Sequence, residues 1–134
     1  MARRIKVLLT KPTQDCHDRG VRYLARKFRD AGFEVVFTNF LVASDILATA
    51  VQEDVDVIGV SSSSGGHMPV FEELLDGLSV SDADDVIVIG GGIIPDVDVR
   101  VLCARGVGAI FGPGSPAEDA IRFIRDHTRQ RSTI

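Results

Sequence analysis

The chain has 134 residues, of which 45% are apolar and 25% charged, and its formal net charge is −4. This length and composition predict one soluble domain over residues 1–134, with its own core at about residues 5–127. The acidic balance and the lack of a recognisable lysine and arginine stripe argue against nucleic-acid binding. Basic residues collect at 3–4 and 125–131, and we expect these two segments to be solvated tails.

Cysteine usage and hydropathy indicate the cellular compartment. The two cysteines, Cys16 and Cys103, form no C-x-x-C motif, which is typical of a reducing cytosol. The N-terminus lacks the apolar segment of a signal peptide, and no apolar run approaches the roughly 18 residues of a membrane span. We therefore expect a cytoplasmic protein that does not enter a membrane.

Apolar periodicity and turn residues divide the chain into alternating strands and helices. Strands are predicted at residues 5–9, 33–38, 55–60, 86–89 and 109–111. Helices are predicted at residues 18–31, 44–53, 68–78, 95–105 and 115 to about 127, with Ser44 as an N-cap, Pro95 in a first turn and Gly32 as a C-terminal cap. The alternation predicts an α/β fold: a flavodoxin-like five-stranded parallel sheet in the order 2-1-3-4-5, with helices on both faces.

Small and polar residues cluster where four of these strands end, in predicted loops at residues 11–20, 61–66, 90–92 and 112–114. Because the carboxyl ends of parallel strands share one edge of a sheet, these loops should line one rim, with room for a large ligand. The first loop contains Asp15-x-His17-x-x-Gly20. A carboxylate two residues from a histidine can hold it in one tautomer and leave the other nitrogen free to ligate a metal. Gly20, without a Cβ, allows a bulky group to approach the backbone.

Other sites that parallel α/β domains carry lack their motifs here. The chain has neither G-x-G-x-x-G nor G-x-x-x-x-G-K-[ST] for phosphates, and no G-x-S-x-G nucleophile elbow. A phosphoacceptor receiver domain needs an aspartate at the end of its third strand, where Val60-Ser61 stands in this chain. The cysteines and histidines also lack the spacing of zinc ligands.

Three coordinated motifs make the chain resemble the cobalamin-binding domain of the methylmalonyl-CoA mutase family, including the separate small subunits of isobutyryl-CoA-type mutases. The resemblance runs from about residue 5 to residue 127. Residues 52–59 and 90–95 are also close to the family's sequence. The family's K-P-G-L-D-G-H-D-R-G is matched at Lys11, Pro12, Asp15, His17, Asp18, Arg19 and Gly20.

The resemblance implies adenosylcobalamin bound base-off and His-on, with His17 as the lower axial ligand of cobalt and Asp15 orienting it. It implies that Lys11 tunes this pair, that Ser61 faces the benzimidazole of the displaced nucleotide tail, and that glycines 90 and 91 give the tail room. No catalytic residue is expected on this chain beyond cofactor ligation. The expected cofactor-binding residues are Lys11, Asp15, Cys16, His17, Asp18, Arg19, Gly20, Ser61, Ser63, Gly65, Gly90, Gly91, Gly92, Gly112, Pro113 and Gly114.

The chain departs from the family's pattern in both of its first two motifs. The family's Ser-x-Leu reads Ser61-Ser62-Ser63 here, so the tail loses the apolar surface of a leucine, whose burial is worth about 1.5–3 kcal/mol. Cys16 replaces the usual glycine beside the ligand, and residues 13–14 read Thr-Gln in place of Gly-Leu.

The resemblance implies an isomerase that is active only with a second chain. We expect the cobalamin-binding small subunit of a two-component acyl-CoA mutase, in a heterodimer or heterotetramer with a large TIM-barrel subunit that binds the acyl-CoA. The substrate would be isobutyryl-, 2-hydroxyisobutyryl-, methylmalonyl- or another acyl-CoA, and the radical rearrangement would depend on the cofactor. Two alternatives stay open: a cobalamin carrier or sensor that does no chemistry, and a glutamate-mutase-like small subunit with an amino-acid substrate.

Overall fold

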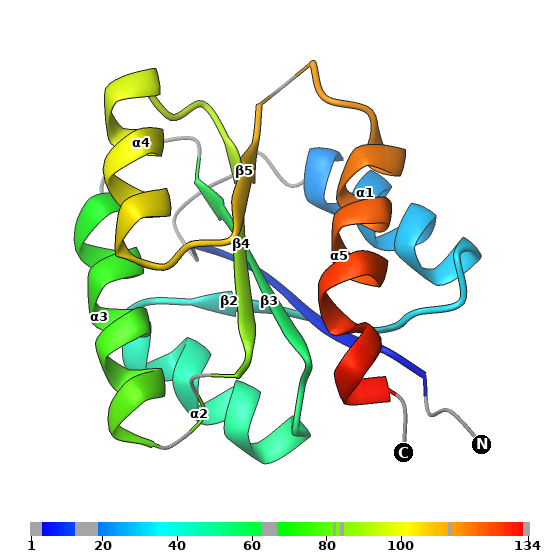
Figure 1. Cartoon of the computed structure of the whole chain (residues 1–134), viewed down its shortest axis with the longest axis horizontal. Coiled ribbons are helices and arrows are strands. Elements are labelled where there is room, and N and C mark those ends of the chain that lie inside the picture. The colour runs from blue at the N-terminus through cyan, green and yellow to red at the C-terminus, as the bar shows by residue number, and fades with distance from the viewer. Residues whose placement is uncertain are drawn as a thin grey trace.

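A computed structural model describes residues 4–12, 19–62, 67–81, 83, 85–112 and 114–132, and only the backbone at residues 62, 67 and 129–132. Five parallel strands form one sheet in the order β2-β1-β3-β4-β5, which confirms the predicted topology (Figure 1). The strands are β1 (Lys6–Pro12), β2 (Glu34–Phe40), β3 (Val57–Ser62), β4 (Ile87–Gly92) and β5 (Ala109–Phe111). The helices are α1 (Arg19–Asp30), α2 (Ala43–Glu53), α3 (His67–Val80), α4 (Asp96–Arg105) and α5 (Ala117–Ser132).

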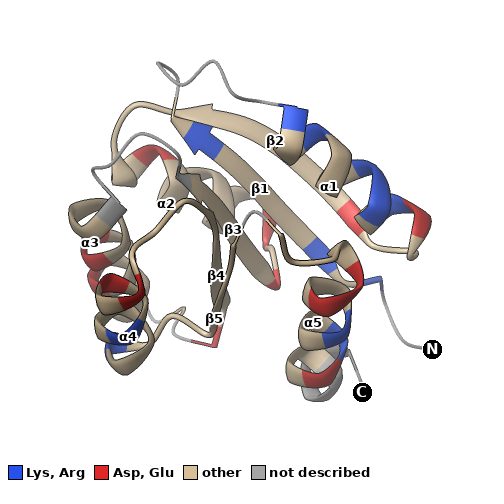
Figure 2. Ribbon diagram, turned by 90° about the horizontal axis from the view of Figure 1, so that it is seen from above, with Lys and Arg blue, Asp and Glu red and all other residues tan. Residues whose placement is uncertain are grey.

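The sheet lies between two helical layers. Helices α1 and α5 cover one face, and α2, α3 and α4 cover the other (Figures 1 and 2). Successive residues of a strand point to opposite faces, so adjacent leucines of β1 enter different cores. Leu9 packs with Val57, Phe28 and Ile124 on the α1 and α5 face. Leu8 packs with residues such as Ile58, Phe71 and Leu102 on the opposite face.

Four strands extend further at their carboxyl ends than the sequence predicted. β1 continues through Lys11 and Pro12, β2 through Phe40, β3 through Ser62, and β4 through Gly92. The expectation that glycines 90–92 form a loop is therefore wrong. Glycine is a weak strand former, but these three residues pair with residues 60–62 of β3, and the strand ends at Gly92, whose φ is positive (114°).

The beginning of α2 also differs from the prediction. Ser44 is inside the helix, and Val42 is the N-cap residue, in an extended conformation. The Asp45 carboxylate accepts hydrogen bonds from the backbone N–H groups of Leu41 (3.0 Å) and Val42 (3.3 Å). The aspartate therefore satisfies the N–H groups of the N-cap residue and of the residue before it, whereas a serine N-cap would have accepted from N–H groups of the first helical turn.

The predicted C-terminal tail is largely helical. α5 continues to Ser132, so residues 125–131 belong to the helix. Arg125 donates a hydrogen bond to the carbonyl of Ala31 (2.9 Å) and lies over the Phe33 ring, 5.7 Å from its centroid. This arginine thus ties α5 to the turn after α1. None of the helices in the described ranges is long and apolar enough to cross a bilayer.

Candidate functional site

An apolar cavity of about 490 Å³ opens at the carboxyl edge of the sheet, between the strands and helices α1 and α5. Its lining comes from segments far apart in the sequence, which the parallel topology brings to one edge. The lining residues are Leu9, Gly20, Val21, Tyr23, Leu24, Gly59, Val60, Ser61, Ile89, Gly90, Gly91, Gly92, Ile93, Phe111, Gly112, Ser115, Pro116, Ala117 and Ala120.

The lining of the apolar cavity carries no ionisable Asp, Glu, Lys, Arg or His side chain among the described residues. Its polar side chains are the hydroxyls of Ser61, Ser115 and Tyr23. Apolar walls with a few hydroxyls are typical of sites for a large, mostly uncharged ligand. The cavity can thus hold an aromatic or aliphatic group and exclude water, but its described lining has no strong acid or base.

Two glycines in β3 and β4 shape the floor of the cavity. A Cβ on Gly59 would lie 2.8 Å from Leu9 Cδ2, so the leucine side chain occupies the space over this residue. A Cβ on Gly91 would meet only the Phe111 carbonyl oxygen, at 3.6 Å, which is an ordinary contact. The bare backbone of Gly91 therefore leaves open space on the cavity side of β4.

Gly90 also lines the cavity, but a side chain at this residue would point to the opposite face of the sheet. A Cβ there would lie 2.7 Å from Phe71 Cζ, on the face covered by α3. The absence of a side chain at Gly90 thus accommodates the buried Phe71 ring of the opposite core, and the space for a ligand lies at Gly91.

The structure brings six of the predicted site residues to the apolar cavity: Gly20, Ser61, Gly90, Gly91, Gly92 and Gly112. Arg19 is exposed at the start of α1, and Gly114 is exposed beyond β5. Seven predicted residues lie outside the described ranges: Asp15, Cys16, His17, Asp18, Ser63, Gly65 and Pro113.

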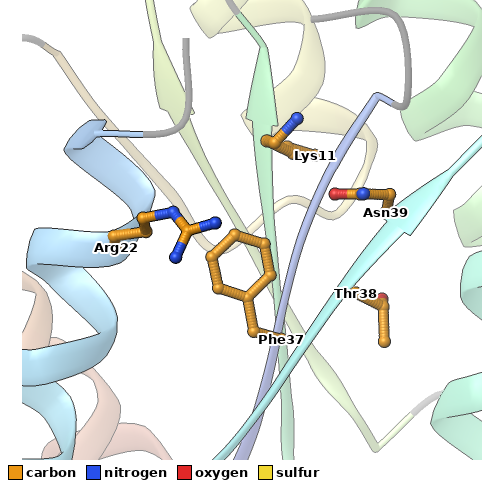
Figure 3. A pocket seen from close by; sticks show the side chains of 5 residues that line it. All are labelled: Lys11, Arg22, Phe37, Thr38 and Asn39. Carbon is orange, nitrogen blue, oxygen red and sulfur yellow. The ribbon is translucent and has the colours of Figure 1, made fainter. Parts of the chain in front are cut away.

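Lys11 lies in a second hollow beside the apolar cavity. This basic hollow, of about 500 Å³, is lined by Lys11, Arg22, Phe37, Thr38 and Asn39. Figure 3 shows the Arg22 guanidinium beside the Phe37 ring and the Lys11 ammonium pointing away from it. The lysine side chain is only 7% exposed, and its ammonium is 3.5 Å from the Pro12 carbonyl oxygen. Since Lys11 belongs to β1, its position is set by strand pairing with Asn39 of β2.

Sequence reasoning missed most of the apolar walls. The aliphatic and aromatic lining residues were assigned only to the core or left without a role. Leu9, Ile89 and Phe111 precede the polar strand ends by one to three residues. That position was the available signal, because the last inward-facing residues of parallel strands border the ligand edge of the sheet. The contribution of α5, through Ala117 and Ala120, had no comparable local signal.

Comparison with known proteins settles the family. Residues 5–122 match the family model described as "B12 binding domain". The chain belongs to the B12-binding domain family. This B12-binding domain is 41% identical over 122 residues to the 2-hydroxyisobutanoyl-CoA mutase small subunit of Aquincola tertiaricarbonis, covering 90% of each chain. It is 37% identical over 123 residues to the pivalyl-CoA mutase small subunit of Xanthobacter autotrophicus, covering 91% of this chain and 82% of that one.

The same domain is found within longer relatives. The methylmalonyl-CoA mutase of Escherichia coli K12 is 40% identical over 123 residues, which are 91% of this chain and 17% of that protein. The chain therefore spans about a sixth of the length of the methylmalonyl-CoA mutases that it matches.

Solved structures with similar backbones include different kinds of protein. A cobalamin-binding protein from Desulfitobacterium hafniense has a TM-score of 0.71 at 23% identity, over 90% of this B12-binding domain and 60% of that chain. The receiver domain of the response regulator NarL from Mycobacterium tuberculosis has a TM-score of 0.74 at 13% identity, over 94% of this chain and 97% of that one. These similarities show the fold alone.

Proposed function

We propose that this chain is the cobalamin-binding small subunit of a two-component, adenosylcobalamin-dependent acyl-CoA mutase. The apolar cavity at the carboxyl edge carries the proposal, because it is a ligand site at the place where a parallel α/β sheet binds large cofactors. The near full-length correspondence with two mutase small subunits supports the assignment to a separate subunit.

The residues of the apolar cavity fit the nucleotide tail of a cobalamin. Its uncharged benzimidazole needs an apolar slot with few hydrogen-bonding groups, and the described lining carries hydroxyls but no charges. Gly91 leaves the backbone of β4 open on that side. Ser61 pairs with it in register and is half-buried at the same wall. Ser61, Gly91 and Phe111 would hold the tail.

His17 is proposed as the lower axial ligand of the cobalt, in a base-off and His-on arrangement. It stands in the connection between β1 and α1, and Gly20, at the helical end of that connection, lines the apolar cavity. Asp15 would accept a hydrogen bond from the other imidazole nitrogen and so orient the ring. Lys11, buried at the end of β1, would tune this pair from the adjoining basic hollow.

When bound, adenosylcobalamin supplies a carbon-centred radical by homolysis of its cobalt–carbon bond, and this radical chemistry belongs to the cofactor. The chain's own contribution is to bind and to exclude water. The apolar lining would keep solvent from the tail, and His17 would hold the cofactor in one orientation. The acyl-CoA would be bound and positioned by a large subunit with a TIM-barrel fold, as the likeness to two mutase small subunits supports.

The decisive experiment combines cofactor binding with reconstitution. The purified chain is titrated with adenosylcobalamin, and the loaded protein is then mixed with candidate large mutase subunits and assayed for acyl-CoA rearrangement. We expect binding by the chain alone, and turnover only after mixing. Turnover by the chain alone would overturn the two-component assignment. Firm binding without turnover with any of these subunits would instead identify a cobalamin carrier or sensor.

A further inference from the structure

Four arginines form a continuous row on α1, which we call the arginine stripe: Arg19, Arg22, Arg26 and Arg29. The expectation that lysine and arginine form no stripe is therefore wrong. Figure 2 shows basic residues recurring along α1. The helix carries five basic side chains and one acidic one, in a chain whose net charge is −4.

The spacing of the stripe places it on the outer side of the helix. Steps of three and four residues keep the four arginines within an arc of about 80°, along about 15 Å of the helix axis. The opposite side, with Val21, Ala25 and Phe28, is buried against the sheet. All four arginines are exposed. The stripe is therefore a solvent-facing row and has no part in the core.

Three of the four charges of the stripe, at Arg19, Arg26 and Arg29, are not compensated by an ion pair within the described ranges. Lys6, by contrast, lies close to two glutamates. The helix dipole favours Arg29, in the last turn of α1, but disfavours Arg19, at the first residue of the helix, so helix stability does not explain the whole stripe.

The basic hollow adjoins the stripe and extends it. Arg22 belongs to both, with its guanidinium carbon 5.9 Å from the centroid of the Phe37 ring. Asn39, which is exposed, contributes an amide at the same hollow. Figure 3 shows these side chains around one depression. A carboxylate-bearing side chain from another molecule could enter it, receive a hydrogen bond from the Asn39 amide and be attracted by the positive charge of the hollow.

We infer that the arginine stripe and the basic hollow form a docking surface for an acidic surface of a partner protein. The inference rests on the proposed function, in which that partner is the large acyl-CoA-binding subunit. Arg19 immediately precedes Gly20, which lines the apolar cavity, so a partner covering the cavity mouth meets the stripe first. A row of about 15 Å is too long for one small anion and fits an extended acidic surface.

Two other occupants fit the charges less well. A second copy of this chain docked through the same face would set two arginine stripes against each other, and this repulsion would oppose self-association. Nucleic acid would be repelled by the excess negative charge of the rest of the chain. There α3 and α4 expose Glu73, Asp96 and other carboxylates.

The test neutralises Arg26 and Arg29, the two arginines of the stripe that are further along α1 from the cavity. Arg26→Gln/Arg29→Gln is compared with Arg100→Gln/Arg105→Gln on α4, which changes net charge equally on the opposite face of the sheet. Binding of each cobalamin-loaded protein to the large subunit is measured at about 0.05 M and about 0.3 M salt. We expect the stripe variant to bind about tenfold more weakly at low salt and to lose about half of its salt dependence, with the α4 variant within about twofold of wild type.

Three further readouts separate the outcomes. Arg26→Lys/Arg29→Lys should restore most of the affinity, because it keeps the charge. Cobalamin titration of the isolated chain tests the proposed function separately, since neither arginine lines the apolar cavity. Wild-type affinity in the stripe variant, with cobalamin binding intact, would overturn the docking surface alone. Tight binding of duplex DNA that the stripe variant loses would show that nucleic acid, and not a protein, is the partner.

Discussion

Ser61 of β3 pairs in register with Gly91 of β4, and both residues line the apolar cavity. The neighbouring Gly90 would direct a Cβ toward Phe71 in the opposite core. Two consecutive glycines of one strand thus serve different purposes. Gly91 leaves room for a ligand, and Gly90 leaves room for a buried aromatic ring.

Gly91→Ala should weaken cobalamin binding without unfolding the protein. The added Cβ has only an ordinary contact with the Phe111 carbonyl oxygen, so the fold tolerates it, but it projects toward the cavity. Overfilling a fitted site costs about 1–3 kcal/mol, which corresponds to about 5- to 150-fold in Kd. Cofactor titration by visible absorbance gives the affinity, and urea denaturation gives the stability.

Gly90→Ala is the matched control and should have the opposite profile. Its Cβ would lie 2.7 Å from Phe71 Cζ. The free energy of unfolding should fall by about 1–3 kcal/mol, with a smaller effect on cofactor affinity once the protein is folded. If Gly91→Ala is the variant that loses stability, or if Gly90→Ala loses only cofactor affinity, the two faces of β4 have been assigned the wrong way round.

His17→Ala should remove the axial nitrogen from the cobalt, and Asp15→Ala should have a milder effect. An orienting partner of a metal-ligating histidine typically matters about 10–100-fold, whereas loss of the ligand itself removes the bond. Electron paramagnetic resonance of the reduced, cobalt(II) form reports the axial nitrogen directly. An unchanged nitrogen signal in His17→Ala would disprove the ligation, and an equal or larger loss in Asp15→Ala would give Asp15 another role.

Ser63→Leu should tighten cobalamin binding. The substitution restores the apolar residue that the resembling family has in its Ser-x-Leu motif, and burial of a leucine side chain is worth up to about 1.5–3 kcal/mol. A cobalamin titration of wild type and variant measures the gain. Ser63→Ala, which removes the hydroxyl without adding a large apolar group, serves as its control. No gain with leucine would mean that residue 63 does not contact the tail.

Lys6 should make folding stability fall at high pH. Its ammonium donates a hydrogen bond to Glu53 (3.0 Å) and lies 3.5 Å from Glu34. The hydrogen bond to Glu53 and the negative charge of both glutamates raise the pKa of Lys6 above 10.5, against an opposing effect of desolvation.

The sign follows from the raised pKa. The stabilising contribution is fully present below pH 10.5 and is lost as the pH rises through the higher pKa of the folded state. Urea midpoints measured between about pH 9 and about pH 12 should therefore fall more steeply for wild type than for Lys6→Gln. Parallel curves for the two proteins would show that the Lys6 ion pairs do not contribute.

The strand order and the placement of the sheet between two helical layers could be predicted from local patterns. Period-3.6 apolar faces such as that of α1 and short apolar runs such as that of β1 are set within each segment. The parallel order then follows from short, right-handed connections. The errors fall at the ends of elements. Asp45, and not Ser44, accepts the hydrogen bonds at the entry to α2. β4 continues to Gly92 because these residues pair with β3. Both features depend on which neighbouring groups are within reach.

The arginine stripe was missed for a different reason. The spacing of its arginines is present in the sequence. The helix was predicted from its apolar residues, and clusters of basic residues were noted only near the two ends of the chain. Once Arg19–Asp30 is a helix with Phe28 in the core, the remaining face follows from helical geometry.

The sequence by itself determined the alternation of strands and helices, the family, and the polar ends of the strands, because each depends on residues close together in the chain. Only the tertiary structure decided what these ends enclose. Leu9, Gly91 and Ala120 meet at one cavity, while Lys11, two residues after Leu9, lines another hollow. The physical reason is that a cavity is defined by strand register and by the packing of α1 and α5 on the sheet. Both arise from contacts between segments distant in the sequence.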